Sequence, residues 1–152
     1  MTDQQKRILD RLRGLCSRRE YCCADVLKKA KEALEGDLQA AQEVVDSLVK
    51  DKYVDDLRYA SAYARDKAAI QGWGAVKIKY MLSAKGVAAS VITEALQEID
   101  PDKSSSRLYK LLENKYRSLK DDPQYRLKLL RFALGRGYSY DEVDSLINTL
   151  LK

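Results

Sequence analysis

Apolar residues recur three and four positions apart along most of the chain, and polar residues fill the positions between them. In the first such segment the apolar positions are Ile8, Leu9, Leu12 and Leu15. This spacing places the apolar side chains on one face of a helix, whereas a strand would need strict alternation. The pattern therefore predicts an all-α fold.

Helix-capping residues and glycines divide this pattern into nine predicted helices. The predicted starts include a capping box at Thr2 to Gln5, Asp37, Asp55 or Asp56, Ser104 to Ser106, Asp122 followed by Pro123, and a second capping box at Ser139 to Glu142. Gly36 and Gly86 are predicted to follow helix ends. The sixth helix is expected to include Leu96 and Ile99 and to stop before Pro101.

The nine helices also form an internal repeat. A shift of about 51 residues aligns the middle third of the chain with the last third. The aligned pairs include Ile78 with Leu129, Gly86 with Gly137, and Ile92 with Val143. The first third aligns more loosely. We therefore expect a single domain over residues 1–152, made of the repeats 4–53, 54–100 and 104–152.

Charge follows the same period. The chain has 152 residues and a net charge of +5, but this total hides a separation into blocks. The basic segments are 6–31 (+6), 58–86 (+5) and 103–137 (+7), and the acidic segments are 32–57 (−6), 87–102 (−4) and 138–152 (−2). In each repeat the first two helices are basic and the third is acidic, which favours a polyanion or an acidic protein surface as partner.

Several functional classes are excluded or disfavoured by composition. The chain has no histidine, so Ser/His/Asp and Cys/His catalytic sites are excluded. The thiols of Cys16, Cys22 and Cys23 lack zinc-site spacing and are predicted to pack between helices. No apolar run approaches the roughly 20 residues that cross a bilayer, and the start of the chain lacks a signal-peptide pattern.

The middle repeat combines basic and aromatic residues. Lys77 and Lys79 flank the apolar Ile78, and Tyr63 and Trp73 lie nearby in sequence. Basic residues interleaved with aromatics are typical of proteins that bind single-stranded nucleic acid. The alternative is a solvated basic face with core aromatics. In that case Trp73 is a plug packed between repeats, an interpretation we favour over a stacking platform.

The middle repeat also carries a set of distinctive motifs. They are Tyr53-Val54-Asp55-Asp56-Leu57-Arg58-Tyr59-Ala60, Arg65, Gly72-Trp73-Gly74, Ile78, Leu82 and Lys85-Gly86-Val87. In the last repeat Lys120-Asp121-Asp122-Pro123 and Arg136-Gly137-Tyr138-Ser139-Tyr140 accompany them. Together they resemble the signature of the RecX regulatory family, bacterial modulators of the RecA recombinase. The chain departs from that family at Cys22 to Asp25, where relatives commonly have a serine cap and a glutamate.

The resemblance implies three tandem three-helix repeats in an elongated, curved array, with no catalytic residues and no cofactor. It also implies a regulatory protein that binds in the groove of the recombinase filament on single-stranded DNA. Such binding would inhibit filament growth, ATP hydrolysis and strand exchange. The candidate filament- or DNA-binding residues are Arg58, Arg65, Lys67, Lys77, Lys79, Lys85, Arg126, Lys128, Arg131 and Arg136.

We therefore expect a monomeric cytoplasmic protein that is not an enzyme, that binds no metal, and that does not associate with membranes. Its expected partners are a RecA-type recombinase filament and single-stranded DNA. One alternative is a basic helical protein that binds nucleic acid alone, without specificity for a recombinase. A second alternative is a scaffold that binds only proteins.

Overall fold

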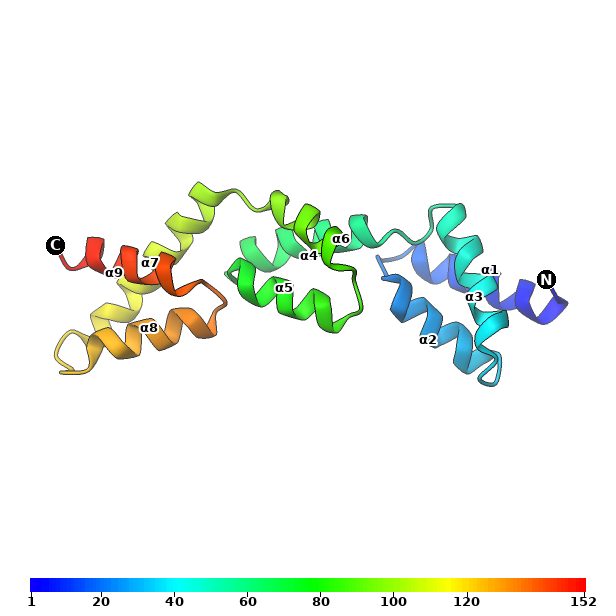
Figure 1. Cartoon of the computed structure of the whole chain (residues 1–152), viewed down its shortest axis with the longest axis horizontal. Helices are drawn as coiled ribbons and strands as arrows, with labels where there is room; N and C mark the ends of the chain where they lie inside the picture. Colours follow the sequence, from blue (N-terminus) through cyan, green and yellow to red (C-terminus); the bar gives the residue numbers. More distant parts are fainter. The chain divides into compact units, whose positions relative to one another are not determined.

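All regular structure in the protein is helical (Figure 1). The computed structural model describes all 152 residues, from Met1 to Lys152. The α-helices are α1 (Asp3–Cys16), α2 (Cys23–Ala33), α3 (Leu38–Lys50), α4 (Asp56–Ala69), α5 (Ala75–Ala84), α6 (Ala89–Ala95), α7 (Pro101–Leu119), α8 (Tyr125–Gly135) and α9 (Tyr140–Leu150). A single 3-10 turn, η1 (Leu96–Glu98), follows α6. The predicted all-α class is confirmed.

The helices form two compact units. Unit 1 consists of Met1–Ala62 and Leu82–Ala95, and unit 2 consists of Tyr63–Met81 and Leu96–Lys152. Helices α4 and α5 therefore contribute residues to both units.

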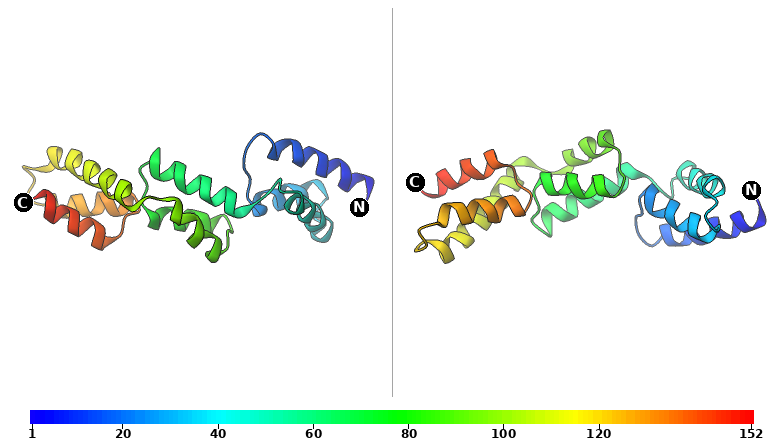
Figure 2. Two further views of the ribbon diagram at one scale, coloured as in Figure 1. Left: turned by 90° about the horizontal axis from the view of Figure 1, so that it is seen from above. Right: turned by 60° about the horizontal axis from the view of Figure 1, so that its bottom comes forward.

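In unit 1, α3 packs against both α1 and α2 (Figure 2). Leu12 from α1, Val26 from α2, and Val44 and Leu48 from α3 are almost fully buried in one apolar core. These are positions of the apolar stripes, so the period of the sequence determines which helix faces meet. Val49, an apolar residue near the end of α3, is 44% exposed.

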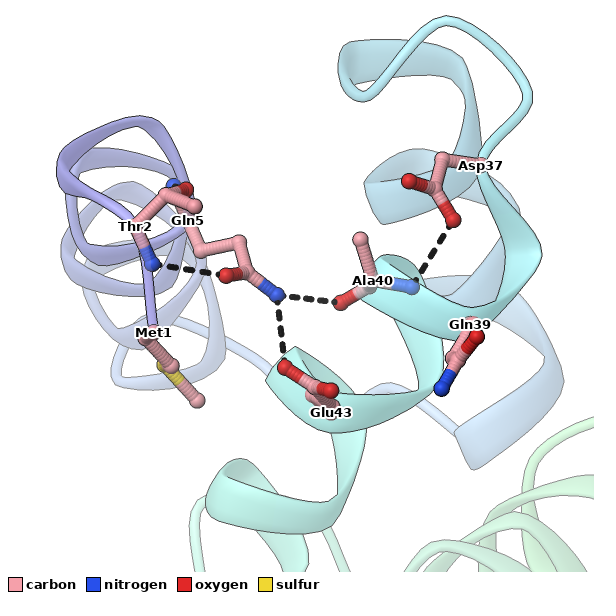
Figure 3. Close-up of a pocket in the computed structure, with 7 residues that line it drawn as sticks. All are labelled: Met1, Thr2, Gln5, Asp37, Gln39, Ala40 and Glu43. Atoms are coloured by element: carbon pink, nitrogen blue, oxygen red, sulfur yellow. Dashed lines mark hydrogen bonds between the residues drawn. The ribbon is translucent and has the colours of Figure 1, made fainter.

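The pairing of α1 with α3 is reinforced by the amide of Gln5, the one buried polar side chain (Figure 3). Its Nε2 donates to the Ala40 carbonyl at 3.1 Å and to the Glu43 carboxylate at 2.9 Å. Its Oε1 accepts from the backbone N–H of Thr2 at 2.8 Å. The shallow pocket around these residues is thus lined by groups that hold two helices together.

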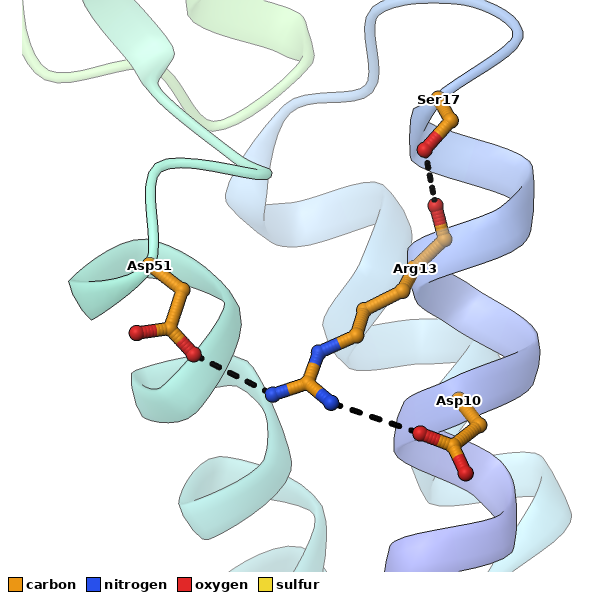
Figure 4. Close-up of polar contacts among 4 residues, drawn as sticks. All are labelled: Asp10, Arg13, Ser17 and Asp51. Atoms are coloured by element: carbon orange, nitrogen blue, oxygen red, sulfur yellow. Dashed lines mark hydrogen bonds and ion pairs between the residues drawn. The ribbon is translucent and has the colours of Figure 1, made fainter.

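A second polar contact joins the other ends of α1 and α3 (Figure 4). The Arg13 guanidinium donates to Asp10 at 3.4 Å and to Asp51 at 3.2 Å, and it lies over the ring of Tyr53 at 5.6 Å. The Ser17 hydroxyl donates to the Arg13 carbonyl at 2.8 Å, which satisfies a carbonyl near the end of α1.

In unit 2, helices α7, α8 and α9 pack pairwise around their own core. Leu112, Leu129 and Ile147 each supply a fully buried side chain from a different helix. The phenol of Tyr138, between α8 and α9, is buried in the same core.

Most predicted helix boundaries are confirmed. Both capping boxes form, at Thr2 and at Ser139, and the Asp37 carboxylate accepts from the Ala40 N–H at 3.1 Å. The second helix of each three-helix group is followed by a glycine with positive φ, namely Gly36 (86°), Gly86 (82°) and Gly137 (94°). Glycine adopts this conformation without the penalty that a Cβ brings.

Two predicted helix starts are wrong. Helix α7 begins at Pro101 and not at the serines 104–106, because the Asp100 carboxylate caps it and proline suits the first helical position. Helix α8 begins at Tyr125 and not directly after Asp122. The Asp122 side chain accepts from the Gln124 N–H at 2.8 Å and so closes a local turn before the helix starts.

The apolar residues of α5 and of the segment around α6 are not all buried. Val76, in the first turn of α5, is 55% exposed. Helix α6 stops at Ala95 and the backbone tightens into η1, where the Ile99 N–H donates to the Leu96 carbonyl at 3.1 Å. The tighter 3-10 winding rotates Leu96 away from full burial, whereas its counterpart Ile147 is buried.

Candidate functional site

The start of α5 lies against the turn between α8 and α9 in unit 2. The Gly74 N–H donates to the Arg136 carbonyl at 2.8 Å, and the Val76 N–H donates to the Gly137 carbonyl at 2.9 Å. The first N–H groups of a helix have no partner within the helix. Here the carbonyls of another turn satisfy two N–H groups at this helix start.

This contact requires glycine on both sides. A Cβ on Gly74 would lie 2.4 Å from the Gly137 carbonyl oxygen, and a Cβ on Gly137 would lie 2.2 Å from the Cβ of Lys77. The Tyr138 hydroxyl adds a hydrogen bond to the Gly72 carbonyl at 3.0 Å. The Gly72-Trp73-Gly74 and Arg136-Gly137-Tyr138 motifs, 60 or more residues apart, are therefore two halves of one contact.

The ten candidate cations fall into distinct groups according to what holds them. Five are paired with carboxylates: Arg58 with Glu20 (2.8 Å), Arg65 with Glu98 (3.5 Å), Lys85 with Asp25 (3.2 Å), Arg126 with Asp144 (2.8 Å), and Lys128 with Asp122. Because a nearby carboxylate neutralises each of these charges, they contribute less to attraction of an anionic partner.

Arg58 has an additional structural role in unit 1. Besides Glu20, its guanidinium donates to the backbone carbonyls of Lys52 at 3.0 Å and Tyr53 at 3.2 Å. Its Nη1 and Nη2 therefore hold the segment before α4, and its Nε pairs with Glu20 in the loop between α1 and α2. These contacts within the protein account for the arginine at position 58, and no bound ligand is needed to explain it.

Three other candidates, Lys67, Lys77 and Arg136, are held by aromatic rings in unit 2. The ammonium groups of Lys67 and Lys77 lie 4.9 Å and 4.3 Å from the centre of the Trp73 ring. Tyr63 meets the same indole edge-on at 6.4 Å. Trp73 is half-buried, and the two lysines occupy its ring. Trp73 therefore positions two cations, and its ring is not an open surface on which a base could stack.

A similar arrangement surrounds Phe132. The Lys115 ammonium lies 5.4 Å and the Arg136 guanidinium 5.2 Å from its ring centre. Arg136 also reaches the Gln71 carbonyl at 3.5 Å, at the turn that carries Trp73. We call the residues Lys67, Trp73, Lys77, Lys115, Phe132 and Arg136 the aromatic–cation cluster.

The aromatic–cation cluster has the chemistry of an anion-binding site. It contains four cations, and none of them forms an ion pair with a carboxylate. Cation–π contacts hold the positive groups in place without neutralising them. Lys115 was not among the residues predicted from sequence, because nothing in the spacing of residues 115 and 132 indicates that they meet.

The two remaining candidates, Lys79 and Arg131, are exposed and form no ion pair. Their positions on α5 and α8 leave them accessible. A binding role for them, as for the other candidates, stays a prediction.

The start of α2 is capped by a residue distant in sequence. Cys22 occupies the N-cap position and makes no side-chain cap. Instead, the Asp56 carboxylate accepts from the Cys23 N–H at 2.7 Å, while Asp55 caps α4 by accepting from the Arg58 N–H at 3.0 Å. The two adjacent aspartates therefore cap two different helices.

The three thiols pack against apolar groups, as predicted. Cys22 is buried, and Cys16 and Cys23 pack on the core of unit 1. Burial, reinforced by the charge of Asp56, raises the pKa of Cys23 to about 12. Burial likewise raises the pKa of Cys16 and Cys22. All three are therefore protonated and poorly nucleophilic near neutral pH.

None of the helices combines the length and the apolar character that a membrane-crossing segment requires.

Comparison with known proteins gives consistent matches. The sequence model of the family described as "RecX, second three-helix domain" matches residues 55–96, and that of "RecX, third three-helix domain" matches residues 104–147. Regulatory protein RecX of Clostridium tetani (strain Massachusetts / E88) is 35% identical over 119 residues, which cover 76% of this chain and 54% of that protein. Regulatory protein RecX of Clostridium perfringens (strain 13 / Type A) is 34% identical over 127 residues, covering 81% and 58%.

Solved structures share the fold. The crystal structure of RecX from Lactobacillus salivarius superimposes with a TM-score of 0.86 at 21% identity, covering 99% of this chain and 98% of that one. A second RecX crystal structure gives a TM-score of 0.86 at 23% identity, covering 96% and 72%. The chain spans somewhat more than half the length of these two Clostridium relatives. The two family matches, with these relatives and this fold, show that the chain belongs to the RecX family of regulatory proteins.

Proposed function

We propose that this protein binds the filament of a RecA-type recombinase on single-stranded DNA. By doing so it inhibits filament growth, ATP hydrolysis and strand exchange. It has no catalytic activity of its own in this proposal, and it acts in the cytoplasm as a monomer. Its three repeats, 4–53, 54–100 and 104–152, act together as one binding domain.

Membership of the RecX family supports the regulatory part of the proposal. The aromatic–cation cluster supports the binding part. Its four cations lack carboxylate partners. Arg136 belongs to the Arg-Gly-Tyr motif, Lys67 and Lys77 pack on the tryptophan of the Gly-Trp-Gly motif, and Lys115 packs on Phe132 beside Arg136. DNA phosphates in a nucleoprotein filament are a suitable anionic partner for such a cluster, and their binding would weaken steeply with salt.

The proposal is tested by following ATP hydrolysis by the recombinase on circular single-stranded DNA. The protein is added below the concentration of recombinase, and filament length is measured by electron microscopy. We expect a lower rate of hydrolysis and shorter filaments. An unchanged rate together with unchanged filament length would contradict the proposal.

A second candidate function is binding of nucleic acid without a recombinase, which the unpaired cations of the cluster also favour. This function predicts salt-sensitive binding to free single-stranded DNA and no effect on hydrolysis beyond competition for DNA sites. The two functions separate at substoichiometric protein, because competition for DNA requires enough protein to cover the strand.

A further inference from the structure

The loop between α1 and α2 and the exposed face of α2 form an open pocket of about 390 Å³ in unit 1. Its lining includes Arg19, Tyr21, Lys28 and Lys29. The pocket lies outside the segments 55–96 and 104–147 that match the family descriptions, apart from Lys85 at its edge.

Positive charge in this pocket is held but not neutralised. The Arg19 guanidinium lies 4.5 Å and the Lys29 ammonium 5.6 Å from the centre of the Tyr21 ring. Lys28 is exposed at the same rim. None of these three cations forms an ion pair.

The acidic groups of the pocket leave a positive excess. One of its two carboxylates, Asp25, is already paired with Lys85 at 3.2 Å. Glu32 is the only carboxylate left to offset the three unpaired cations. The pocket therefore attracts an anion.

The arrangement recurs along the chain with different residues each time. Tyr21, Trp73 and Phe132, one from each third of the chain, each hold two cations. The three rings are not at equivalent positions of the 51-residue repeat, because Tyr21 aligns with Gly72. The shared property is therefore the chemistry of the site and not the repeat alone.

We propose that this pocket around Tyr21 is a phosphate-binding site for single-stranded nucleic acid. A ligand with successive anionic groups suits a chain that presents several such sites, and phosphodiesters provide one anion per nucleotide. Arginine binds phosphate oxygens through two N–H groups, and the Tyr21 ring holds Arg19 and Lys29 in place without neutralising their charge.

The test compares two variants of the full chain that lose equal charge. The pocket variant is Arg19→Gln/Lys28→Gln/Lys29→Gln. The control variant is Lys6→Gln/Lys31→Gln/Lys50→Gln, three exposed lysines that do not line the pocket. Binding of fluorescent oligo(dT) is measured by anisotropy over a range of salt concentrations, without recombinase. This assay keeps the result independent of the proposed effect on filaments.

For the pocket variant we expect the slope of log affinity against log salt concentration to become shallower. The expected change is roughly 0.7 for each phosphate that the protein no longer neutralises, about 2 for three phosphates. The control should retain nearly the original slope. A Tyr21→Leu variant, which keeps an apolar side chain against the core, should show a partial decrease, and thermal unfolding checks that each variant folds.

Equal slopes for the pocket and control variants would overturn the proposal. A second measurement compares the acetylation of Lys28 and Lys29 in the presence of inorganic phosphate and of oligo(dT). The proposal would also be overturned if inorganic phosphate protected the two lysines, oligo(dT) did not, and the pocket variant kept the original slope.

Discussion

At the scale of single residues, the contact between the start of α5 and the turn after α8 depends on the absence of two side chains. Gly137 combines a φ of 94° with a position where any Cβ would overlap Lys77. Gly135, only two residues earlier, has no positive φ, and a Cβ added there would have no atom within 4 Å. The two glycines therefore form a natural pair for comparison.

We predict that Gly137→Ala destabilises the protein by about 2–4 kcal/mol, since it adds backbone strain and a steric overlap at one position. Gly135→Ala should be neutral or stabilising by up to about 1 kcal/mol, because alanine favours the helix. Urea unfolding followed by circular dichroism measures both. Similar free energies of unfolding for the two variants would show that this contact is absent in solution.

At the scale of helices, unit 1 is joined by capping groups that come from other elements. Asp56 belongs to α4 yet caps α2, and Asp25 in the first turn of α2 binds Lys85 from the turn after α5. Each contact links helix ends that are 30 or more residues apart in sequence. The order of unit 1 therefore depends on its helix termini as well as on its core.

We predict that Asp56→Ala lowers the free energy of unfolding by about 1 kcal/mol, because the Cys23 N–H loses its acceptor. Asp56→Asn keeps an oxygen at this position and should lose less than half as much. Equilibrium unfolding in urea gives both values. If the alanine variant were as stable as the parent protein, the cap would have no energetic role.

The Asp25–Lys85 pair predicts a dependence of stability on pH. Although burial opposes it, hydrogen bonds from Cys22 and Lys85 lower the pKa of Asp25 below 3.8. A carboxyl whose pKa is lowered by folding stabilises the folded state above its ordinary pKa, and this contribution is lost as pH falls through the folded pKa.

Accordingly, Asp25→Asn should cost about 0.5–1 kcal/mol near neutral pH, the range expected of a partly exposed pair, and progressively less as the pH falls below the ordinary pKa of an aspartate. The matched control is Glu94→Gln, an exposed carboxylate of α6 without an ion pair. It should show no such trend. Unfolding curves recorded at several pH values test this, and a pH-independent cost for Asp25→Asn would contradict the pair's electrostatic role.

At the scale of the whole molecule, net charge is a poor guide to where an anion binds. Five of the ten candidate cations are neutralised locally by carboxylates. Aromatic rings hold a smaller set whose charge remains available. Binding strength should therefore follow the partner of each cation rather than the number of cations.

We predict that Lys67→Gln/Lys77→Gln weakens inhibition of recombinase ATP hydrolysis about tenfold or more, because two unpaired charges are removed. Arg126→Gln/Lys128→Gln removes the same charge from two carboxylate-paired cations and should have a much smaller effect. The protein concentration that halves the hydrolysis rate is the quantity to compare. Equal losses for the two double variants would refute the distinction between paired and aromatic-held cations.

Much of the fold was predictable from local sequence. The apolar period identified helices throughout, and the Thr2 and Ser139 capping boxes and the glycines after α2, α5 and α8 marked their ends. These signals act within one or two helical turns. Errors occurred where two local signals competed, as at Asp100 and Ser104 and in the turn at Asp122, where the stronger cap or a side-chain turn determined the boundary.

The sequence by itself determined the helical class, the internal repetition and the alternation of basic and acidic segments, because each depends on residue type and spacing along the chain. Only the tertiary structure decided which charges are available, since an ion pair such as Lys128 with Asp122 or a ring contact such as Lys115 with Phe132 depends on which side chains folding brings together. It also decided that Asp56 caps a distant helix and that Gly74 meets Gly137. Coulomb and cation–π interactions act over a few ångströms in space, and the position of a residue in the chain does not specify its neighbours at that distance.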